Sequence, residues 1–143
     1  MAKQIFVNLP VKDLNKSVAF FTSLGFSFNA DFTDENATSM IIGENICAIL
    51  LTERFFKTFT QKDIADTTKS NEVIVCISAD SREEVDEMVR KAFNAGATKH
   101  NDVQDHGWMY AHGFQDIDGH LWEVVHMLPI QAEGINMSEG AQN

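Results

Sequence analysis

The chain has 143 residues, 44% of them hydrophobic and 22% charged, which fits one globular domain and excludes a disordered or fibrous chain. Its formal net charge is -10, and no cluster of Lys or Arg offers the cations that phosphate binding requires, so we expect no nucleic-acid partner. No apolar run approaches the roughly 20 residues of a membrane span and no signal-peptide pattern precedes the first strand, so we expect a cytoplasmic protein with no membrane partner.

The first third of the chain predicts a strand, a helix and three further strands. Residues 5–11 alternate so that one face is strongly apolar, as in a half-buried strand. Asp13 is placed to cap a helix with an apolar stripe, and Gly25 is placed to end it. The further strands are predicted at residues 26–30, 37–42 and 45–52.

The pattern then restarts, which is the most informative feature of the sequence. Residues 72–79 alternate like residues 5–11, and Ser81 with Glu84 forms a capping box at the start of a second helix that ends at Gly96. Strands are predicted after it at residues 97–103, 108–114 and 120–127. This internal repeat of about 70 residues predicts an α+β fold in which two tandem βαβββ units form a curled mixed sheet around a cavity.

The repeat also predicts how the chain is organised. We expect a single domain over residues 1–128, with repeat 1 at about 4–52, a connector or flap at 53–70, repeat 2 at about 71–127, and a flexible tail at 129–143. Phe55, Phe56 and Phe59 stand at near-helical spacing in the connector. They serve either to cover a ligand or only to pin the connector onto the sheet.

The two cysteines give no sign of redox or metal chemistry. Cys47 and Cys76 lie inside apolar, strand-like runs without CxxC spacing, so we predict two reduced and buried thiols. Neither a glycine-rich phosphate loop nor a nucleophile-elbow pattern is present. A nucleotide cofactor and covalent catalysis are therefore not expected.

Two stretches of the sequence carry a family resemblance. The opening VNLPVKDL at residues 7–14, with Leu24-Gly25-Phe26, and the ending FQDIDGHLWE at residues 114–123 resemble the glyoxalase/bleomycin resistance/extradiol dioxygenase family, also called the vicinal oxygen chelate superfamily. The resemblance extends to about Met127. It implies the paired βαβββ fold and, as is common in the family, a homodimer.

The resemblance also implies four metal-ligand positions, one on the first and one on the last strand of each unit. In this sequence they are Phe6, Leu50, Glu72 and Glu123, so only the two glutamates can bind a metal. Carboxylates alone suit Mg²⁺ or Ca²⁺ better than Zn²⁺, Ni²⁺ or Fe²⁺. We therefore expect either no cofactor or a divalent metal weakly bound by Glu72 and Glu123.

The last hairpin predicts a candidate site. An even turn through residues 116–119 would place His112 opposite Glu123 and Tyr110 opposite Val125, with Trp108 on the same face. The resemblance points Glu123 into the cavity, and strand parity adds residues from the first strand of each unit. The predicted site comprises Glu123 and His112 as catalytic residues and Asn8, Trp108, Tyr110 and Cys76 as ligand-binding residues.

Each of these residues also has a structural interpretation. His112 is equally explained as a hydrogen-bonded wall residue, Glu123 as an ion-paired strand residue and Glu72 as a solvated one. Trp108 and Tyr110 are equally explained as wall residues that combine a large apolar ring with one polar group, the indole N–H or the phenol hydroxyl.

Three functions remain open on the sequence alone. The first is an enzyme, a lyase, isomerase or dioxygenase relative with a degenerate metal site. The second is a non-catalytic protein that binds an antibiotic-like small molecule and acts by sequestration. The third is a dimeric scaffold with a vestigial cavity.

Overall fold

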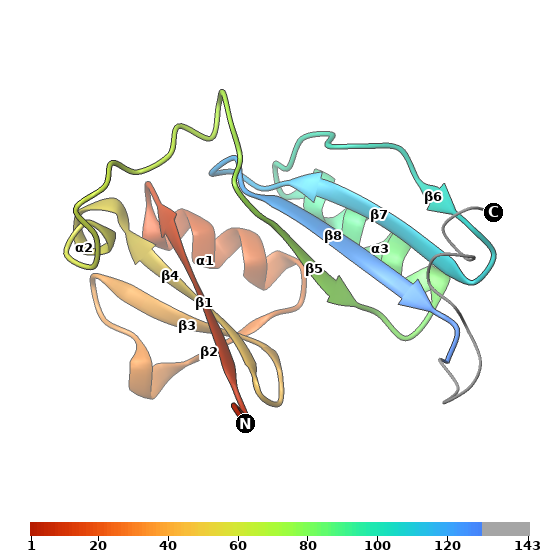
Figure 1. Ribbon diagram of the computed structural model, residues 1–143, viewed down its shortest axis with the longest axis horizontal. Coiled ribbons are helices and arrows are strands. Elements are labelled where there is room, and N and C mark those ends of the chain that lie inside the picture. Colours follow the sequence, from red (N-terminus) through yellow and green to blue (C-terminus); the bar gives the residue numbers. More distant parts are fainter. Residues whose placement is uncertain (130–143) are drawn as a thin grey trace. The chain divides into compact units, whose positions relative to one another are not determined.

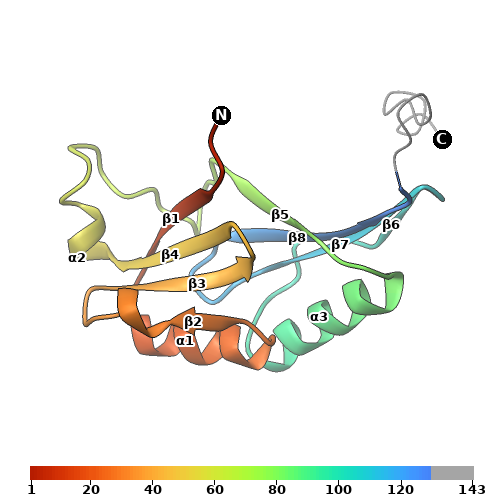
Figure 2. The same cartoon turned by 90° about the horizontal axis from the view of Figure 1, so that it is seen from below.

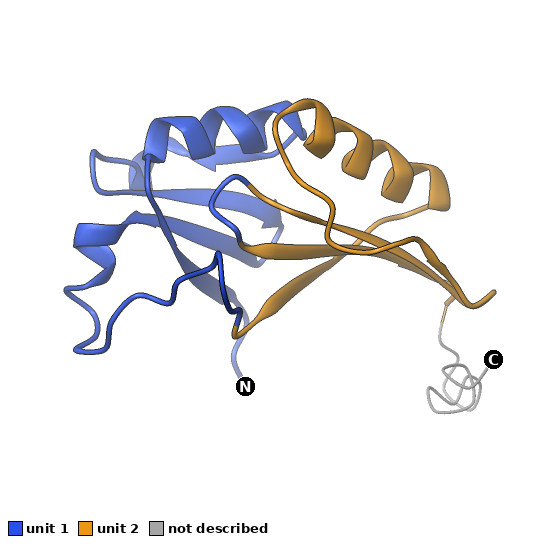
Figure 3. Cartoon of the chain, turned by 90° about the horizontal axis from the view of Figure 1, so that it is seen from above, with its two compact units in different colours: residues 1–71, 117–119 blue, residues 72–116, 120–143 orange. Residues whose placement is uncertain are grey.

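The structure is a computed structural model that describes residues 1–129 and divides into two compact units (Figure 3). Unit 1 consists of residues 1–71 with residues 117–119, and unit 2 begins at residue 72 and contains the rest. Each unit is a βαβββ-like module with a four-stranded mixed sheet, which confirms the predicted α+β fold class. The predicted tail lies outside the described residues except for Pro129. The extent of a single domain stays a prediction.

Unit 1 contains seven elements (Figure 1). They are β1 (Ile5–Val11), α1 (Leu14–Ser23), β2 (Ser27–Asn29), the 3-10 helix η1 (Ala30–Phe32), β3 (Ala37–Gly43), β4 (Ile46–Thr52) and the short α2 (Glu53–Phe56). The sheet order is β1-β4-β3-β2, with β1 parallel to β4 and the remaining neighbours antiparallel. As predicted, the side chain of Asp13 accepts the N–H of Lys16 at 3.1 Å, and Gly25 has a φ of 103° just past the helix.

The core of unit 1 lies between α1 and one face of its sheet (Figure 2). Leu9 of β1 stands beside Leu50 of β4, and both are almost completely buried. Phe20 and Phe21 are the buried aromatic residues of α1, with ring centroids 4.9 Å apart. Because successive side chains of a strand point to opposite faces, the residues between these buried positions form the other face of the sheet.

The tip of the β7–β8 hairpin, residues 117–119, belongs to unit 1. Asp118 is only 8% exposed, and its carboxylate accepts the N–H of Lys12 and the hydroxyl of Ser17, each at 2.9 Å. The backbone carbonyl of Asp118 also accepts the hydroxyl of Thr67 at 2.6 Å. The Asp118 carboxylate thus accepts hydrogen bonds from a backbone N–H just before α1 and from the hydroxyl of a buried serine within α1.

Unit 2 repeats the module. Its elements are β5 (Ile74–Ser78), α3 (Arg82–Asn94), β6 (Gln104–Asp105), β7 (Met109–Gln115) and β8 (Leu121–Met127), in the sheet order β5-β8-β7-β6. Ser81 accepts the N–H of Glu84 at 3.1 Å, as the capping box predicts, while the Glu84 carboxylate reaches the N–H of Asp80 at 2.7 Å. The core contains the nearly parallel rings of Phe114 and Trp122, 6.5 Å apart.

One predicted strand is wrong. Residues 97–103 form only an isolated bridge between Thr98 and Gln115, and the edge strand β6 is confined to two residues after them. The reason is that Asn101 directs its polar groups to side chains and to a backbone N–H of β7, so it does not continue a regular ladder. Among residues 1–129, no helix is long and apolar enough to cross a membrane.

Candidate functional site

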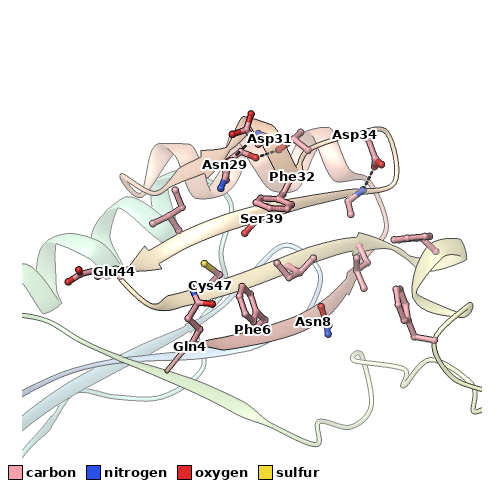
Figure 4. A pocket seen from close by; sticks show the side chains of 18 residues that line it. Gln4, Phe6, Asn8, Asn29, Asp31, Phe32, Asp34, Ser39, Glu44 and Cys47 are labelled. Atoms are coloured by element: carbon pink, nitrogen blue, oxygen red, sulfur yellow. Dashed lines mark hydrogen bonds between the residues drawn. The ribbon is translucent and has the colours of Figure 1, made fainter. Parts of the chain in front are cut away.

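The face of the unit 1 sheet away from α1 forms the floor of a cavity of about 740 Å³ (Figure 4). The strand registers place Phe6 of β1 beside Cys47 of β4 and Cys47 beside Ile41 of β3. The next row consists of Asn8, Ile49 and Ser39, and all six residues line the cavity. The floor is therefore three strands wide and mainly apolar, with an amide, a hydroxyl and a thiol on it.

Aromatic residues outside the floor complete the cavity. Phe32 of η1 is 70% exposed, and Phe59, just beyond α2, is 69% exposed. Phe59 packs edge to face on Phe55 with centroids 5.3 Å apart. Thr52 caps α2 by accepting the N–H of Phe55 at 3.3 Å, which fixes where the connector leaves β4. The connector therefore supplies two phenyl rings to the cavity.

The polar part of the rim is a short loop held by its own side chains. Asn29 accepts the N–H of Asp31 at 3.0 Å, and Asp34 accepts the N–H groups of Asn36 and Ala37 at 2.8 and 3.0 Å. These are the local side-chain bonds that Asn and Asp make in turns. The loop between β2 and β3 thereby has a defined conformation with carboxylates at the mouth of the cavity.

The predicted register of the β7–β8 hairpin is wrong by one residue. His112 stands opposite Val124 and Glu123 stands opposite Gly113, because the turn has five residues between Gln115 and Leu121. Asp116 and His120 close this odd turn with two hydrogen bonds. The Asp116 N–H donates to the carbonyl oxygen of His120 at 2.9 Å, and the Asp116 carboxylate accepts the N–H of His120 at 3.0 Å. A one-residue shift moves every side chain of the strand to the other face.

The shift separates the two predicted catalytic residues. His112 and Tyr110 lie on the α3 side of the sheet, where the His112 ring is 6.5 Å from the Phe93 ring and Tyr110 donates to Asp86 at 2.6 Å. Trp108 pairs with Leu128 and shares this parity; its buried indole N–H has no hydrogen-bond partner in the described part of the chain. His112 and Tyr110 are thus engaged with α3, which corrects the prediction that they face a cavity with Glu123.

Glu123 lies on the opposite face of the unit 2 sheet and is held by Asn101. The Asn101 amide donates to Glu123 Oε1 at 2.6 Å and accepts the N–H of Gly113 at 3.1 Å. Since a backbone N–H can only donate, the second bond fixes which end of the amide faces Glu123. The other carboxylate oxygen, Oε2, is buried and has no hydrogen-bond partner among residues 1–129.

Glycine is required beside this carboxylate. A Cβ added at Gly113 would meet Glu123 Oε2 and would lie 2.5 Å from the carbonyl oxygen of Trp122. The absence of a side chain at position 113 therefore leaves the space that Glu123 occupies.

The cysteines do not match the prediction of two buried thiols. Cys76 is exposed and Cys47 half-buried, because both lie on the sheet faces away from the helices. Cys76 stands beside Glu123 in the β5–β8 register. Desolvation raises the pKa of the Cys76 thiol, and the Glu123 carboxylate raises it further.

The four positions implied by the resemblance do not form a metal site. Phe6 lies on the cavity floor, but Leu50 is 1% exposed on the opposite, α1-facing side of its sheet, which corrects its assignment as a position facing a ligand. Glu72 is exposed and lies before β5. No group of three or more His, Cys, Asp or Glu residues able to hold a metal ion occurs within residues 1–129. The side chains described therefore do not fit the metal that the resemblance implies.

Sequence reasoning identified part of the cavity and missed the rest. Asn8, predicted to bind a ligand, lines this cavity, and so does Phe6, which stands at an implied metal position. Phe55 and Phe59, whose spacing left open whether they cover a ligand or pin the connector, line it too. Ile49 and Ser39 were missed, although alternation along residues 37–52 carries the signal that places them on one face. Asn101 was missed because it lies in an irregular segment, where periodicity carries no information.

Comparisons with known proteins agree with this architecture. Residues 3–43 match the family model described as bleomycin resistance protein-like N-terminal, and no curated protein matches the chain. The hypothetical protein SA1046 from S. aureus is 29% identical with a TM-score of 0.75, the match covering 88% of this chain and 94% of that one.

Two further solved structures share the fold at lower identity. A glyoxalase/bleomycin resistance protein/dioxygenase family enzyme from Burkholderia phytofirmans is 17% identical, with a TM-score of 0.76 and coverage of 89% of this chain and 100% of that one. TnmS3, an antibiotic binding protein from a Streptomyces species, is 16% identical, with a TM-score of 0.63 and coverage of 90% and 98%. The same fold thus occurs in an enzyme and in a binding protein.

Proposed function

We propose that the chain is a member of the glyoxalase/bleomycin resistance/dioxygenase superfamily that binds an apolar small molecule in the unit 1 cavity without a metal. The match of residues 3–43 to the bleomycin resistance protein-like N-terminal model and the shared fold support this. The observation that carries this proposal is the cavity itself, about 740 Å³ in volume with phenyl rings from β1, η1 and the connector. Ligand sites commonly have volumes of about 300–1,000 Å³ and mainly apolar walls with a few polar groups. The protein then acts by sequestering its ligand.

Solved structures with this fold include a binding protein as well as enzymes. TnmS3 shares the fold and is an antibiotic binding protein. In this chain the positions implied for a family metal include Phe6 and Leu50, which have no metal-binding atoms. A binding protein needs only the cavity, whereas the family's metal chemistry needs ligands that the described residues do not assemble.

Titration with the neutral fluorescent probe phenylnaphthylamine tests the proposal. We expect saturable binding that weakens by about tenfold in Phe32→Ala or Phe59→Ala, since each change removes a ring from the cavity and apolar burial contributes about 25 cal/mol per Å². Both rings are largely exposed, so neither change should unfold the protein. Phe93→Ala on α3 is the matched control, because Phe93 does not line the cavity. Equal loss in all three variants would contradict the proposal.

A second candidate function rests on Glu123. Oε2 of Glu123 is buried and has no hydrogen-bond partner among residues 1–129, while Asn101 holds the other oxygen. Oε2 therefore keeps its capacity to accept a proton or a hydrogen bond. A lyase, isomerase or dioxygenase relative would use Glu123 as its base. Mg²⁺ or Ni²⁺ binding by calorimetry, lost in Glu123→Gln, would favour this candidate over simple sequestration.

We also propose a homodimer. Each sheet has its long helix on one face only, and the other face exposes apolar residues, with Phe6 and Ile74 each 52% exposed. An uncovered apolar sheet face of this kind favours association, and a twofold partner can cover it and complete the cavity. Light scattering at micromolar concentration should give twice the chain mass. A monomer would remove this part of the proposal, and a dimer without probe binding would favour the scaffold with a vestigial cavity.

The cytoplasmic location is likewise retained as a proposal. Both cysteines are free thiols on half-buried or exposed strand positions, which suits a reducing compartment. Cell fractionation of the tagged protein would test it.

A further inference from the structure

The charged residues that line the unit 1 cavity are all acidic. Of the 18 residues that line it, three are acidic, namely Asp31, Asp34 and Glu44, and within the described chain none of the lining residues is Lys, Arg or His. Arg54 and Lys57 lie on the connector near the lining phenylalanines but are not among the lining residues. A ligand entering this mouth therefore meets carboxylates and no cation.

The loop that carries Asp31 and Asp34 is held by local hydrogen bonds. Asp34 is bound through Oδ1 to two backbone N–H groups, and Asn29 caps the 3-10 helix that carries Asp31. The Asp34 carboxylate is therefore held at the rim, and so is the backbone that carries Asp31. A fixed negative rim around a partly desolvated apolar site selects ligands by charge.

The aromatic lining acts in the same direction. The rings of Phe6 on the floor and Phe32 on the wall line the cavity (Figure 4). Phe59 lines it as well. The negative faces of aromatic rings attract cations within about 6 Å of the ring centroid. Rings and carboxylates thus both favour a positive ligand, while the apolar floor favours a flat hydrophobic body.

From these observations we infer that the cavity selects neutral or cationic aromatic molecules and rejects anionic ones. This inference rests on the proposed function and names the chemical class of its ligand. The rim carboxylates are exposed and partly screened, so one anionic group on the ligand should weaken binding on the order of fivefold at low salt. The penalty should shrink as the ionic strength rises.

A matched pair of probes tests the inference. Phenylnaphthylamine is neutral, and anilinonaphthalene sulfonate has the same rings with one sulfonate. We expect the sulfonate to bind at least about fivefold more weakly, and proflavine, a planar aromatic cation, to lose affinity as salt is added. Equal affinities for the neutral and sulfonated probes would overturn the inference while leaving the proposed function intact. Absence of binding by all three probes would overturn both.

Two variants test whether the acidic residues at the cavity rim cause the weaker binding of the sulfonated probe. The double substitution Asp31→Asn with Asp34→Asn should raise sulfonate affinity toward that of the neutral probe, and it keeps the Oδ1 acceptor that holds the loop. Glu35→Gln removes one charge from the same exposed loop but not from the cavity lining, so it should leave the ratio nearly unchanged. An equal change in both proteins would show a general charge effect and overturn the inference.

Discussion

His112 and Glu123 lie on opposite faces of the unit 2 sheet, and Asn101 connects them. The His112 ring nitrogen Nε2 is 3.1 Å from the carbonyl oxygen of Asn101, and the Asn101 side chain donates to Glu123 at 2.6 Å. The irregular segment after α3 is therefore fastened to β7 and β8 at the same residue. The orientation of Glu123 therefore depends on Asn101, which is distant in sequence from both Glu123 and His112.

Asn101→Ala should lower the free energy of unfolding by about 1–3 kcal/mol, because it leaves Gly113 N–H and Glu123 Oε1 without their partner in a partly buried position. Urea unfolding measures this. Asp102→Ala is the matched control, since Asp102 is exposed and forms only a surface ion pair with Lys99. If the two variants lose equal stability, Asn101 does not hold Glu123.

Gly113→Ala should be strongly destabilising, by more than about 2 kcal/mol, because the new Cβ collides with Glu123 and with backbone that cannot move away freely. Gly43→Ala is a matched change in a strand of unit 1, where the nearest atom to the added Cβ is at 3.4 Å. Thermal unfolding of the two variants side by side should show a large fall in melting temperature only for the first.

Asp118→Ala should destabilise unit 1 by about 1–3 kcal/mol, because it removes the acceptor of two donors, one of them the hydroxyl of the completely buried Ser17. Asp118→Asn keeps one acceptor oxygen and should lose less. Denaturant titrations of the two variants would reveal this order, and equal losses would show that the charge and not the retained acceptor oxygen matters at the hairpin tip.

Cys76 should react slowly with iodoacetamide near neutral pH, because desolvation first and Glu123 second raise its pKa and so reduce the thiolate fraction. In a Cys47→Ser background, Glu123→Gln should lower the pKa of Cys76 without restoring its ordinary value. Since the pKa is raised on folding, this group's contribution to stability is present below the unfolded pKa and lost as pH rises through the folded one. An unchanged rate profile in Glu123→Gln would contradict the electrostatic effect of Glu123 on Cys76.

The sequence predicted the fold well where hydrophobic alternation and capping act locally. Residues 5–11 and the helices begun by Asp13 and Ser81 are found where their patterns place them. The candidate site was harder because it depended on the length of one turn. The backbone hydrogen bond from Asp116 N–H to His120 O gives the turn five residues, where four had been predicted. This one-residue difference places His112 and Glu123 on opposite faces of the sheet.

The cavity walls show the same limit. Nothing in local periodicity says that residues 30–32 form a 3-10 helix, which brings Phe32 to the cavity. Phe55 and Phe59 could be recognised as helical in spacing, but whether they covered a ligand or pinned the connector depended on contacts distant in sequence. Such contacts depend on tertiary packing and cannot be predicted from a short segment of the sequence.

The place of Asp118 has a consequence for how this protein can be divided. A fragment that stopped at residue 71 would contain every helix and strand of the first repeat, yet it would lack the carboxylate that receives Lys12 N–H and Ser17 Oγ. The sequence repeat and the physical unit therefore have different boundaries. A gene segment that encodes residues 1–71 therefore omits part of unit 1, and an exchange of halves between relatives would have to include residues 117–119 with the first half to keep these hydrogen bonds.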